Sequence, residues 1–273
     1  MSAQLKSFLM ALGIGFLFSF PAEGQERRLP VYEVSRVAGR LNIDGRLDER
    51  AWAVAPIVGD FVNNRDGSPS RHKTEARVLY DNDFIYFSFR SADDNIWSTF
   101  KQRDLHLWLE EVVEVFIQAD PRVPNYIELE VNPLGAMLDI YLLDARKPLH
   151  YESWNSEKLK WAVQVEGTVD GKGGDREWTC EMALPIEDVA TAPHRPPQPG
   201  DRWRMNMYRV ERLPEVAELA WSPTLQGDFH ILSRFGEIVF TNRRVGSTGQ
   251  HGGSSPTVKQ GSSGDHSASL KDH

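Results

Sequence analysis

The residues best suited to chemistry gather in one stretch, residues 104–135, which reads DLHLWLEEVVEVFIQADPRVPNYIELEVNPLG. Trp108 stands beside several acids and precedes two segments in which apolar and polar residues alternate. Successive side chains of a strand point to opposite faces. The polar faces of the two segments therefore carry Glu114, Phe116 and Gln118 in the first and Tyr126, Glu128, Glu130 and Asn132 in the second. Paired in a sheet, they predict a groove lined by acids, an amide and aromatic rings.

Such a face has the chemistry to bind a sugar. A pyranose has C–H groups on one face and hydroxyls around its rim, so a tryptophan can stack under it while carboxylates and amides bind the hydroxyls. Trp108 is expected to be partly exposed because its neighbours are polar. Arg204 and Arg209, on a later strand, are expected either to donate hydrogen bonds near this face or to neutralise Glu128 or Glu130.

The composition limits the other classes of function. With 273 residues and 40% hydrophobic content, the chain can bury one sizeable core. A net charge of −8 argues against binding to nucleic acids or anionic membranes. The single cysteine, Cys180, excludes an intramolecular disulfide, and its place in an alternating apolar run predicts a buried, inert thiol.

The two ends of the chain predict segments outside the fold. Lys6, the apolar run over residues 8–20 and the small residues at Ala22 and Gly24 are typical of a signal peptide over residues 1–24. We therefore expect a secreted or periplasmic protein that does not insert into the membrane after cleavage. Residues 245–273 are rich in Gly, Ser and His and are expected to be disordered. The folded domain is expected to span residues 25–244.

Short strands with turn residues between them predict the fold. Residues 74–90 have the pattern of a hairpin around an Asp81-Asn82-Asp83 turn, and further strands are expected near 137–143, 161–166, 178–184 and 203–211. In the sequence IDGRLDE, Gly45 is expected to allow a turn, and Asp48 to cap a short helix whose Trp52 packs inward. Without any long helical pattern, we expect an all-β fold: an antiparallel β-sandwich of two sheets, immunoglobulin-like or jelly-roll-like, with short helical turns.

Oxygen-rich side chains also predict a metal site. Calcium is bound by several carboxylate and carbonyl oxygens. Asp93, Asp94 and Glu111 are the candidate ligands, although the chain has no EF-hand spacing.

Taken in order, eight sequence blocks between about residues 37 and 240 resemble family 9 of the carbohydrate-binding modules, which is related to the DOMON-type β-sandwich superfamily. The blocks are IDGRLDERAW, VLYDNDFIYFSFRSAD, LWLEEVVEVFI, NYIELEVNPLGAMLDI, WTCEMALP, PGDRWRMNMYRVE, AWSPT and FHILSRFGEIVF. The resemblance implies a β-sandwich that binds glycan chain ends or oligosaccharides, contains structural calcium, and supports carbohydrate catabolism, with glycoside hydrolases as candidate partners.

The resemblance also implies a set of binding residues. The first aromatic platform corresponds to Trp108, the following acid to Glu114 and the strand amide to Asn132. The second platform corresponds to Phe229, where the family has a tryptophan, and Glu130 stands where the family has a basic residue.

Two other functions are alternatives to binding. Glu114 with Glu128 or Glu130 could serve as the carboxylate pair of a glycoside hydrolase, because neighbouring strands can hold two carboxylates ~5 Å apart. A haem-binding redox domain, as in related sandwich proteins, would need a Met and a His as axial ligands. The candidates are Met137, Met205, Met207, His106 and His230, although strand alternation already predicts Met205 and Met207 in the core.

Overall fold

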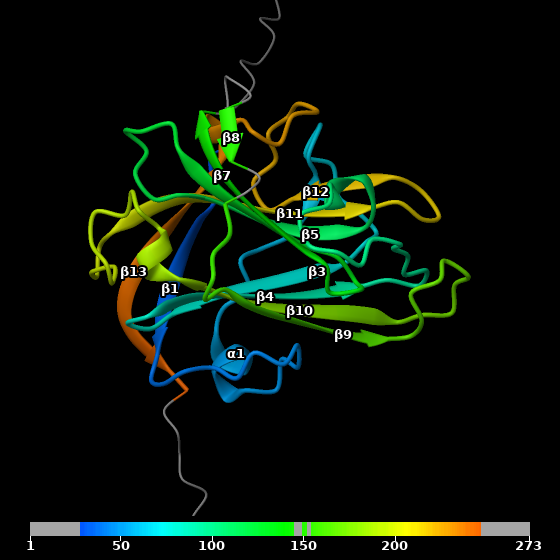
Figure 1. Ribbon diagram of the computed structural model, residues 1–273, viewed down its shortest axis with the longest axis horizontal. Helices are drawn as coiled ribbons and strands as arrows, with labels where there is room; N and C mark the ends of the chain where they lie inside the picture. Colours follow the sequence, from blue (N-terminus) through cyan, green and yellow to red (C-terminus); the bar gives the residue numbers. More distant parts are fainter. Residues whose placement is uncertain (1–27, 145–148, 152–153, 247–273) are drawn as a thin grey trace, which may run out of the picture.

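The computed structural model of the protein describes residues 28–144, 149–151 and 154–246 (Figure 1). The predicted signal peptide, residues 1–24, and residues 247–273 of the predicted tail lie outside the described residues. Val245 is still part of the last strand and is buried, so the folded domain extends slightly beyond the predicted boundary at residue 244. Within the described ranges, no helix has the length and apolar character needed to cross a membrane.

The described chain is almost entirely strand and loop, as predicted. The strands are β1 (Val31–Val37), β2 (Val62–Asn63), β3 (Thr74–Tyr80), β4 (Phe84–Ala92), β5 (Val112–Gln118), β6 (Tyr126–Val131), β7 (Met137–Asp144), β8 (Leu149–Tyr151), β9 (Lys160–Glu166), β10 (Glu177–Pro185), β11 (Arg202–Glu211), β12 (Ala217–Ala220) and β13 (Gly236–Val245). The helical pieces are α1 (Arg50–Val54) and the 3-10 turns η1 (Leu107–Leu109), η2 (Ile186–Asp188) and η3 (Leu232–Arg234).

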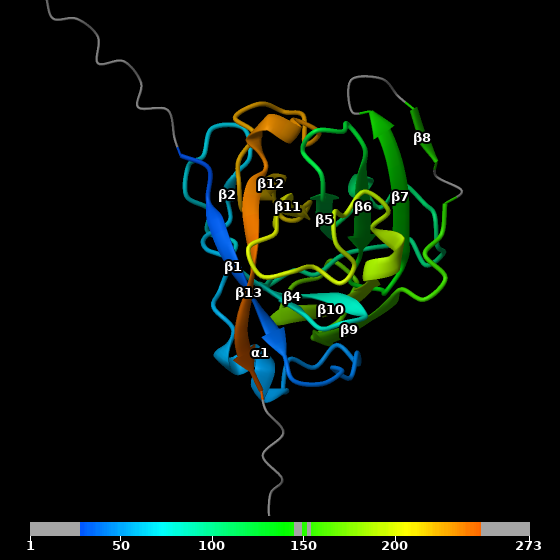
Figure 2. The same ribbon diagram turned by 90° about the vertical axis from the view of Figure 1, so that its left-hand side faces the viewer.

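The strands form a β-sandwich made from one curled sheet. Their order is β8-β7-β6-β5-β11-β13-β1-β3-β4-β10-β9, with β12 and β2 attached beside β11. In Figures 1 and 2, β5, β7 and β11 lie in one layer and β3, β4, β10 and β9 in the other. The predicted antiparallel arrangement holds except at β1, which pairs in parallel with both β13 and β3. The N-terminal strand thus joins the two layers, so the sheet is continuous and mixed rather than two separate sheets.

The main core lies between the two layers and follows the predicted alternation. Met205 and Met207 of β11 are fully buried there, as predicted, with the apolar residues of β5 and β6. Those of β5 and β6 are Val113, Val115, Ile117, Ile127, Leu129 and Val131. Cys180 also lies in this core, and its burial raises the pKa of the thiol, which agrees with an inert cysteine. A second apolar cluster lies on the opposite face of the β5-β6-β11 layer.

The helix α1 covers the outer face of the other layer, against β4 and β10. Trp52 packs inward as predicted, and its indole N–H donates to the buried carboxylate of Glu181 (2.7 Å). The same carboxylate accepts hydrogen bonds from the backbone N–H groups of Asp44 and Gly45, and Gly45 has the predicted positive φ, +82°. The prediction that Asp48 caps the helix is wrong, because the helix begins one residue later, with Glu49 at the N-cap and without a side-chain cap.

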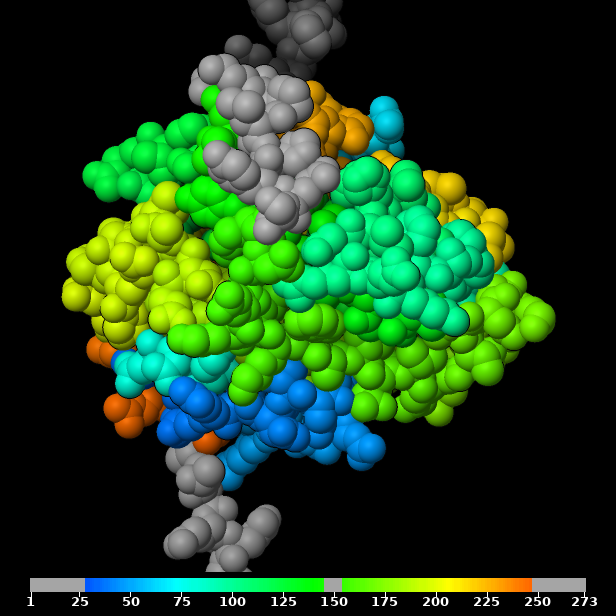
Figure 3. All heavy atoms as spheres, viewed as in Figure 1, coloured from blue at the N-terminus to red at the C-terminus, as the bar shows by residue number. Residues whose placement is uncertain are grey.

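The space-filling view shows how these parts share one face of the molecule (Figure 3). The segment that contains α1 forms its lower part, and the segment around residue 100 forms much of its upper part. That upper segment leads directly into η1 and Trp108.

Candidate functional site

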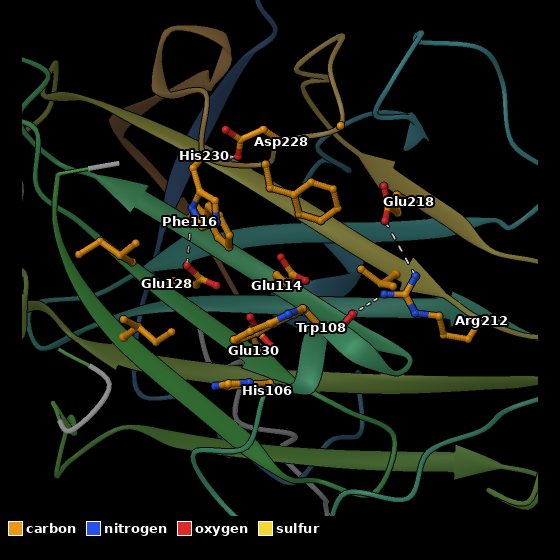
Figure 4. Close-up of a pocket in the computed structure, with 15 residues that line it drawn as sticks. His106, Trp108, Glu114, Phe116, Glu128, Glu130, Arg212, Glu218, Asp228 and His230 are labelled. Atoms are coloured by element: carbon orange, nitrogen blue, oxygen red, sulfur yellow. Dashed lines mark hydrogen bonds and ion pairs between the residues drawn. The ribbon is translucent and has the colours of Figure 1, made fainter. Parts of the chain in front are cut away.

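The outer face of the β5-β6-β11 layer carries a pocket of about 430 Å³ (Figure 4). It lies on the polar face that strand alternation predicts, between η1 and the loop that follows β12. Its lining comprises His106, Trp108, Glu114, Phe116, Glu128, Glu130, Ile140, Leu142, Val210, Arg212, Glu218, Gly227, Asp228, Phe229 and His230. The predicted groove on this stretch therefore exists, and it is a pocket that combines aromatic rings with acids.

Two aromatic pairs form the walls of this pocket. Trp108 is half-buried on η1, in agreement with the predicted partial exposure, and its ring stacks on His106 with ring centres 4.4 Å apart. Phe229 stacks on Tyr208 of β11 with ring centres 4.3 Å apart and planes 11° apart. The Tyr208 hydroxyl also donates to the Phe229 carbonyl oxygen (2.7 Å). Both predicted platforms, Trp108 and Phe229, thus line one pocket.

Arg212 holds the Trp108 side of the pocket in place. Its guanidinium donates to the carbonyl oxygens of Trp108 and Leu109 and lies 3.9 Å from the Glu218 carboxylate (Figure 4). The sequence pattern does not single out this residue, because it follows the end of β11, where strand alternation no longer indicates which way a side chain points.

Three acids form the floor of the pocket. In the pairing of β5 with β6, Glu114 lies opposite Glu130 and Phe116 opposite Glu128, so the three carboxylates share one face. One oxygen from each lies within 4.8 Å of one from each of the others. All three side chains are buried, with Glu114 at 1% and Glu130 at 0% exposure.

Burial and mutual repulsion control the charge of this floor. Burial raises the pKa of Glu114, and the neighbouring Glu128 raises it further, whereas Arg212 acts in the opposite direction. Burial also raises the pKa of Glu130, and the neighbouring Glu114 and Glu128 raise it further, whereas the Trp108 backbone N–H acts in the opposite direction. Like charges this close cannot all ionise readily, so we expect the floor to retain a proton at neutral pH.

The structure does not bring Asn132 to the pocket. β6 ends at Val131, and the Asn132 side chain turns into the loop that follows. Its Nδ2 group donates to Ser98 Oγ (2.7 Å) and to the Phe100 carbonyl oxygen (2.8 Å). Its Oδ1 accepts from the backbone N–H groups of residues 134 and 136. Asn132 is therefore a structural residue of the turn rather than part of the pocket lining.

The two predicted arginines also lie elsewhere. Arg204 is on the outer face of β11 opposite Gln118, beyond the residues that line the pocket. Arg209 is on the opposite face, where its guanidinium pairs with Glu211 and with Asp93 (3.3 Å). The expectation that Arg209 neutralises Glu128 or Glu130 is therefore wrong, because alternation along β11 turns it away from them.

Arg209 is the centre of a second acid cluster. Asp93 and Glu111, two of the predicted calcium ligands, lie together with Glu211, whereas Asp94 is exposed and outside the cluster. Glu111 accepts a hydrogen bond from the Trp97 backbone N–H (2.7 Å). Burial and the neighbouring Glu211 raise the pKa of Glu111 to about 9, so it is protonated at neutral pH.

The fit of this second cluster to calcium is limited. Calcium takes six to eight oxygen ligands, and a guanidinium already contacts two of the three carboxylates. The calcium site stays a prediction: the predicted Asp93 and Glu111 lie in the cluster, and Glu211 would take the place expected for Asp94.

The haem alternative finds no axial pair among its five candidates. Met137, Met205 and Met207 all lie in the core between the layers, whereas His106 and His230 line the pocket on the other face.

The sequence matches the family model described as "Carbohydrate-binding family 9" over residues 42–240. No curated protein matches the chain. Among solved structures, a protein from Bacteroides uniformis described as a candidate carbohydrate-binding protein is 17% identical, with a TM-score of 0.64, covering 78% of this chain and 100% of that one.

Two structures of a family 9 carbohydrate-binding module from Caldicellulosiruptor kristjanssonii are also similar. The complex with cellotriose is 14% identical with a TM-score of 0.56, covering 78% of this chain and 94% of the module. The complex with glucose is 14% identical with a TM-score of 0.55, covering 78% and 96%. At these identities the structural likeness concerns the fold.

Proposed function

The chain belongs to carbohydrate-binding family 9 and is a carbohydrate-binding protein, and we propose that its ligand, a glycan chain end or an oligosaccharide, binds in the pocket between Trp108 and Phe229. The observation that carries this proposal is the meeting of two aromatic platforms over a floor of hydrogen-bonding carboxylates in one pocket. These residues come from η1, β5, β6 and the loop after β12, so only the folded chain assembles them.

The dimensions and chemistry of the pocket support this proposal. A volume of about 430 Å³ lies within the range of small-ligand sites, roughly 300–1,000 Å³. The half-buried rings of Trp108 and Phe229 offer stacking surfaces for the C–H face of a sugar. Glu114 and Glu130 offer acceptors, and donors when protonated, for its hydroxyls.

Calorimetric titration with cello-oligosaccharides and a glycan array test this proposal. Trp108→Ala is expected to weaken binding at least about fivefold, because stacking contributes on the order of 1 kcal/mol beyond area burial. The matched control is Leu109→Ala, which removes an exposed side chain from the same 3-10 turn without changing the pocket lining. Equal affinities for Trp108→Ala and the wild type would contradict the proposed platform.

Hydrolysis is a second candidate, favoured by one observation: Glu114, Glu128 and Glu130 converge on one pocket. A glycoside hydrolase needs one carboxyl as acid and a second as base or nucleophile. A sensitive hydrolysis screen distinguishes the two functions. If the wild type hydrolyses a glycan and Glu114→Gln abolishes this turnover, the protein is a glycoside hydrolase. Binding without turnover supports the first proposal.

Three further proposals concern the setting of this function. Export is supported by the N-terminal sequence pattern, and cell fractionation tests it. A role in carbohydrate catabolism with glycoside hydrolases as partners rests on the family resemblance, and co-purification with such enzymes tests it. A structural calcium ion at Asp93, Glu111 and Glu211 would raise the melting temperature, and a chelator would then lower it.

A further inference from the structure

The protein contains two buried groups of three acids, and they differ in how their charge is balanced. In the first, Asp93, Glu111 and Glu211 lie together, and the Arg209 guanidinium, which is itself 1% exposed, pairs with Asp93 and Glu211. The protein thus supplies a cation at this cluster. The second group, Glu114, Glu128 and Glu130, forms the pocket floor.

Glu114 and Glu130 have no such cation in direct contact, and Arg212 acts on Glu114 only through space. Neither forms an ion pair with a lysine or arginine of the described ranges, and Arg212, the arginine that lines the pocket, is bound instead to two carbonyl oxygens and Glu218. Oε1 of Glu114 and both carboxylate oxygens of Glu130 are buried and have no hydrogen bond of ordinary geometry. Buried polar groups normally find partners, and both side chains belong to the lining of the pocket.

The walls above this floor also suit a positively charged group. The rings of Trp108 and Phe229 line the same pocket, and the face of an aromatic ring attracts cations. An ammonium group has three N–H donors and no acceptor, so it matches a floor that consists of carboxylate acceptors. A neutral hydroxyl would satisfy such a floor less completely, because it offers one donor instead of three and carries no charge to offset that of the carboxylates.

We infer that the pocket selects carbohydrates that carry a protonated amine, with the ammonium group of an amino sugar placed between Glu114 and Glu130. The inference rests on the proposed function, since it names the class of sugar that the same pocket takes. Glu130 then has a specific role: an acid at this position accommodates a cation that a basic residue would repel.

Calorimetric titration at pH 6 with three β-1,4-linked trimers tests this inference. The probes are the glucosamine trimer, which is cationic, the N-acetylglucosamine trimer, which is neutral at the same position, and cellotriose, which has a hydroxyl there. The wild-type protein is expected to bind the glucosamine trimer at least about tenfold more tightly than either neutral trimer.

Two variants check that the floor is responsible. Glu130→Gln keeps the shape of the side chain and cannot ionise, so the fold is expected to persist. It should lower the preference for the glucosamine trimer over cellotriose at least about tenfold. Glu187→Gln, a charge removal at an exposed side chain paired with Lys158, should leave all three affinities unchanged.

The outcomes separate this inference from the proposed function. Equal or tighter binding of cellotriose overturns the amine preference and leaves carbohydrate binding in this pocket intact. Failure of all three trimers, and of the glycan array, overturns both. Binding of cellotriose that needs added calcium and disappears with a chelator also overturns the inference, because the floor would then hold a metal ion.

Discussion

Replacing Glu111 with glutamine is expected to change how the stability of the protein depends on pH. Burial and the neighbouring Glu211 raise the pKa of Glu111 from 4.5 to about 9 in the folded state. Between these values the folded protein holds one more proton at this site than the unfolded chain. The contribution of this group to stability is therefore fully present below pH 4.5 and is lost as the pH rises towards 9.

The size of the effect follows from the proton count. One proton taken up on folding lowers the free energy of unfolding by about 1.4 kcal/mol per pH unit. Over the three units from pH 5 to pH 8, the titration of Glu111 therefore lowers the free energy of unfolding of the wild type by up to about 4 kcal/mol. Glutamine does not titrate, and its amide can still accept from the Trp97 N–H and donate to Glu211. The variant should therefore gain stability relative to the wild type as the pH rises.

Urea unfolding at pH 5, 6, 7 and 8, followed by tryptophan fluorescence, measures this difference. The curve of unfolding free energy against pH is expected to be flatter for Glu111→Gln by about 1.4 kcal/mol per unit. Glu187→Gln removes an exposed carboxylate and should follow the wild-type curve. Parallel curves for Glu111→Gln and the wild type would refute the conclusion that Glu111 is protonated when folded.

Three more substitutions test structural roles by urea unfolding or thermal melting. Asn132→Ala should lower the free energy of unfolding by about 2–4 kcal/mol, because it leaves several buried hydrogen-bonding groups unpaired. An unchanged free energy of unfolding would contradict its role in the turn. Arg209→Met should cost about 3–5 kcal/mol by leaving buried carboxylates without their cation, and unchanged stability would show that another group balances them. Gly45→Ala should cost at least about 1–2 kcal/mol, because φ is +82° and a Cβ would lie 2.8 Å from the Val163 carbonyl carbon; an unshifted melting temperature would argue against this strain.

Several elements could be predicted from local patterns alone. The hairpin of residues 74–90 folds as expected because its turn residue Asp81 accepts hydrogen bonds from the backbone N–H groups of residues 83 and 84. The prediction that Asp48 caps the helix was wrong because the helix begins one residue later, after Glu49. The carboxylates of Asp44 and Glu49 instead accept hydrogen bonds from the side chain and the backbone N–H of Asn42.

The sequence by itself determined which face of β5 and β6 each side chain occupies, because the period of a strand is two residues. It therefore placed Glu114, Glu128 and Glu130 together and predicted a partly exposed Trp108. Period alone cannot say which distant segment covers a face. Only the tertiary structure brought Phe229 and Trp108 into one pocket, placed the Arg212 guanidinium against the Trp108 carbonyl oxygen, and used Asn132 for a turn. The tertiary structure also pairs Arg209 with one acid cluster and places Glu114 and Glu130 in the lining of a pocket. The reason is that long-range packing decides which charged side chains meet.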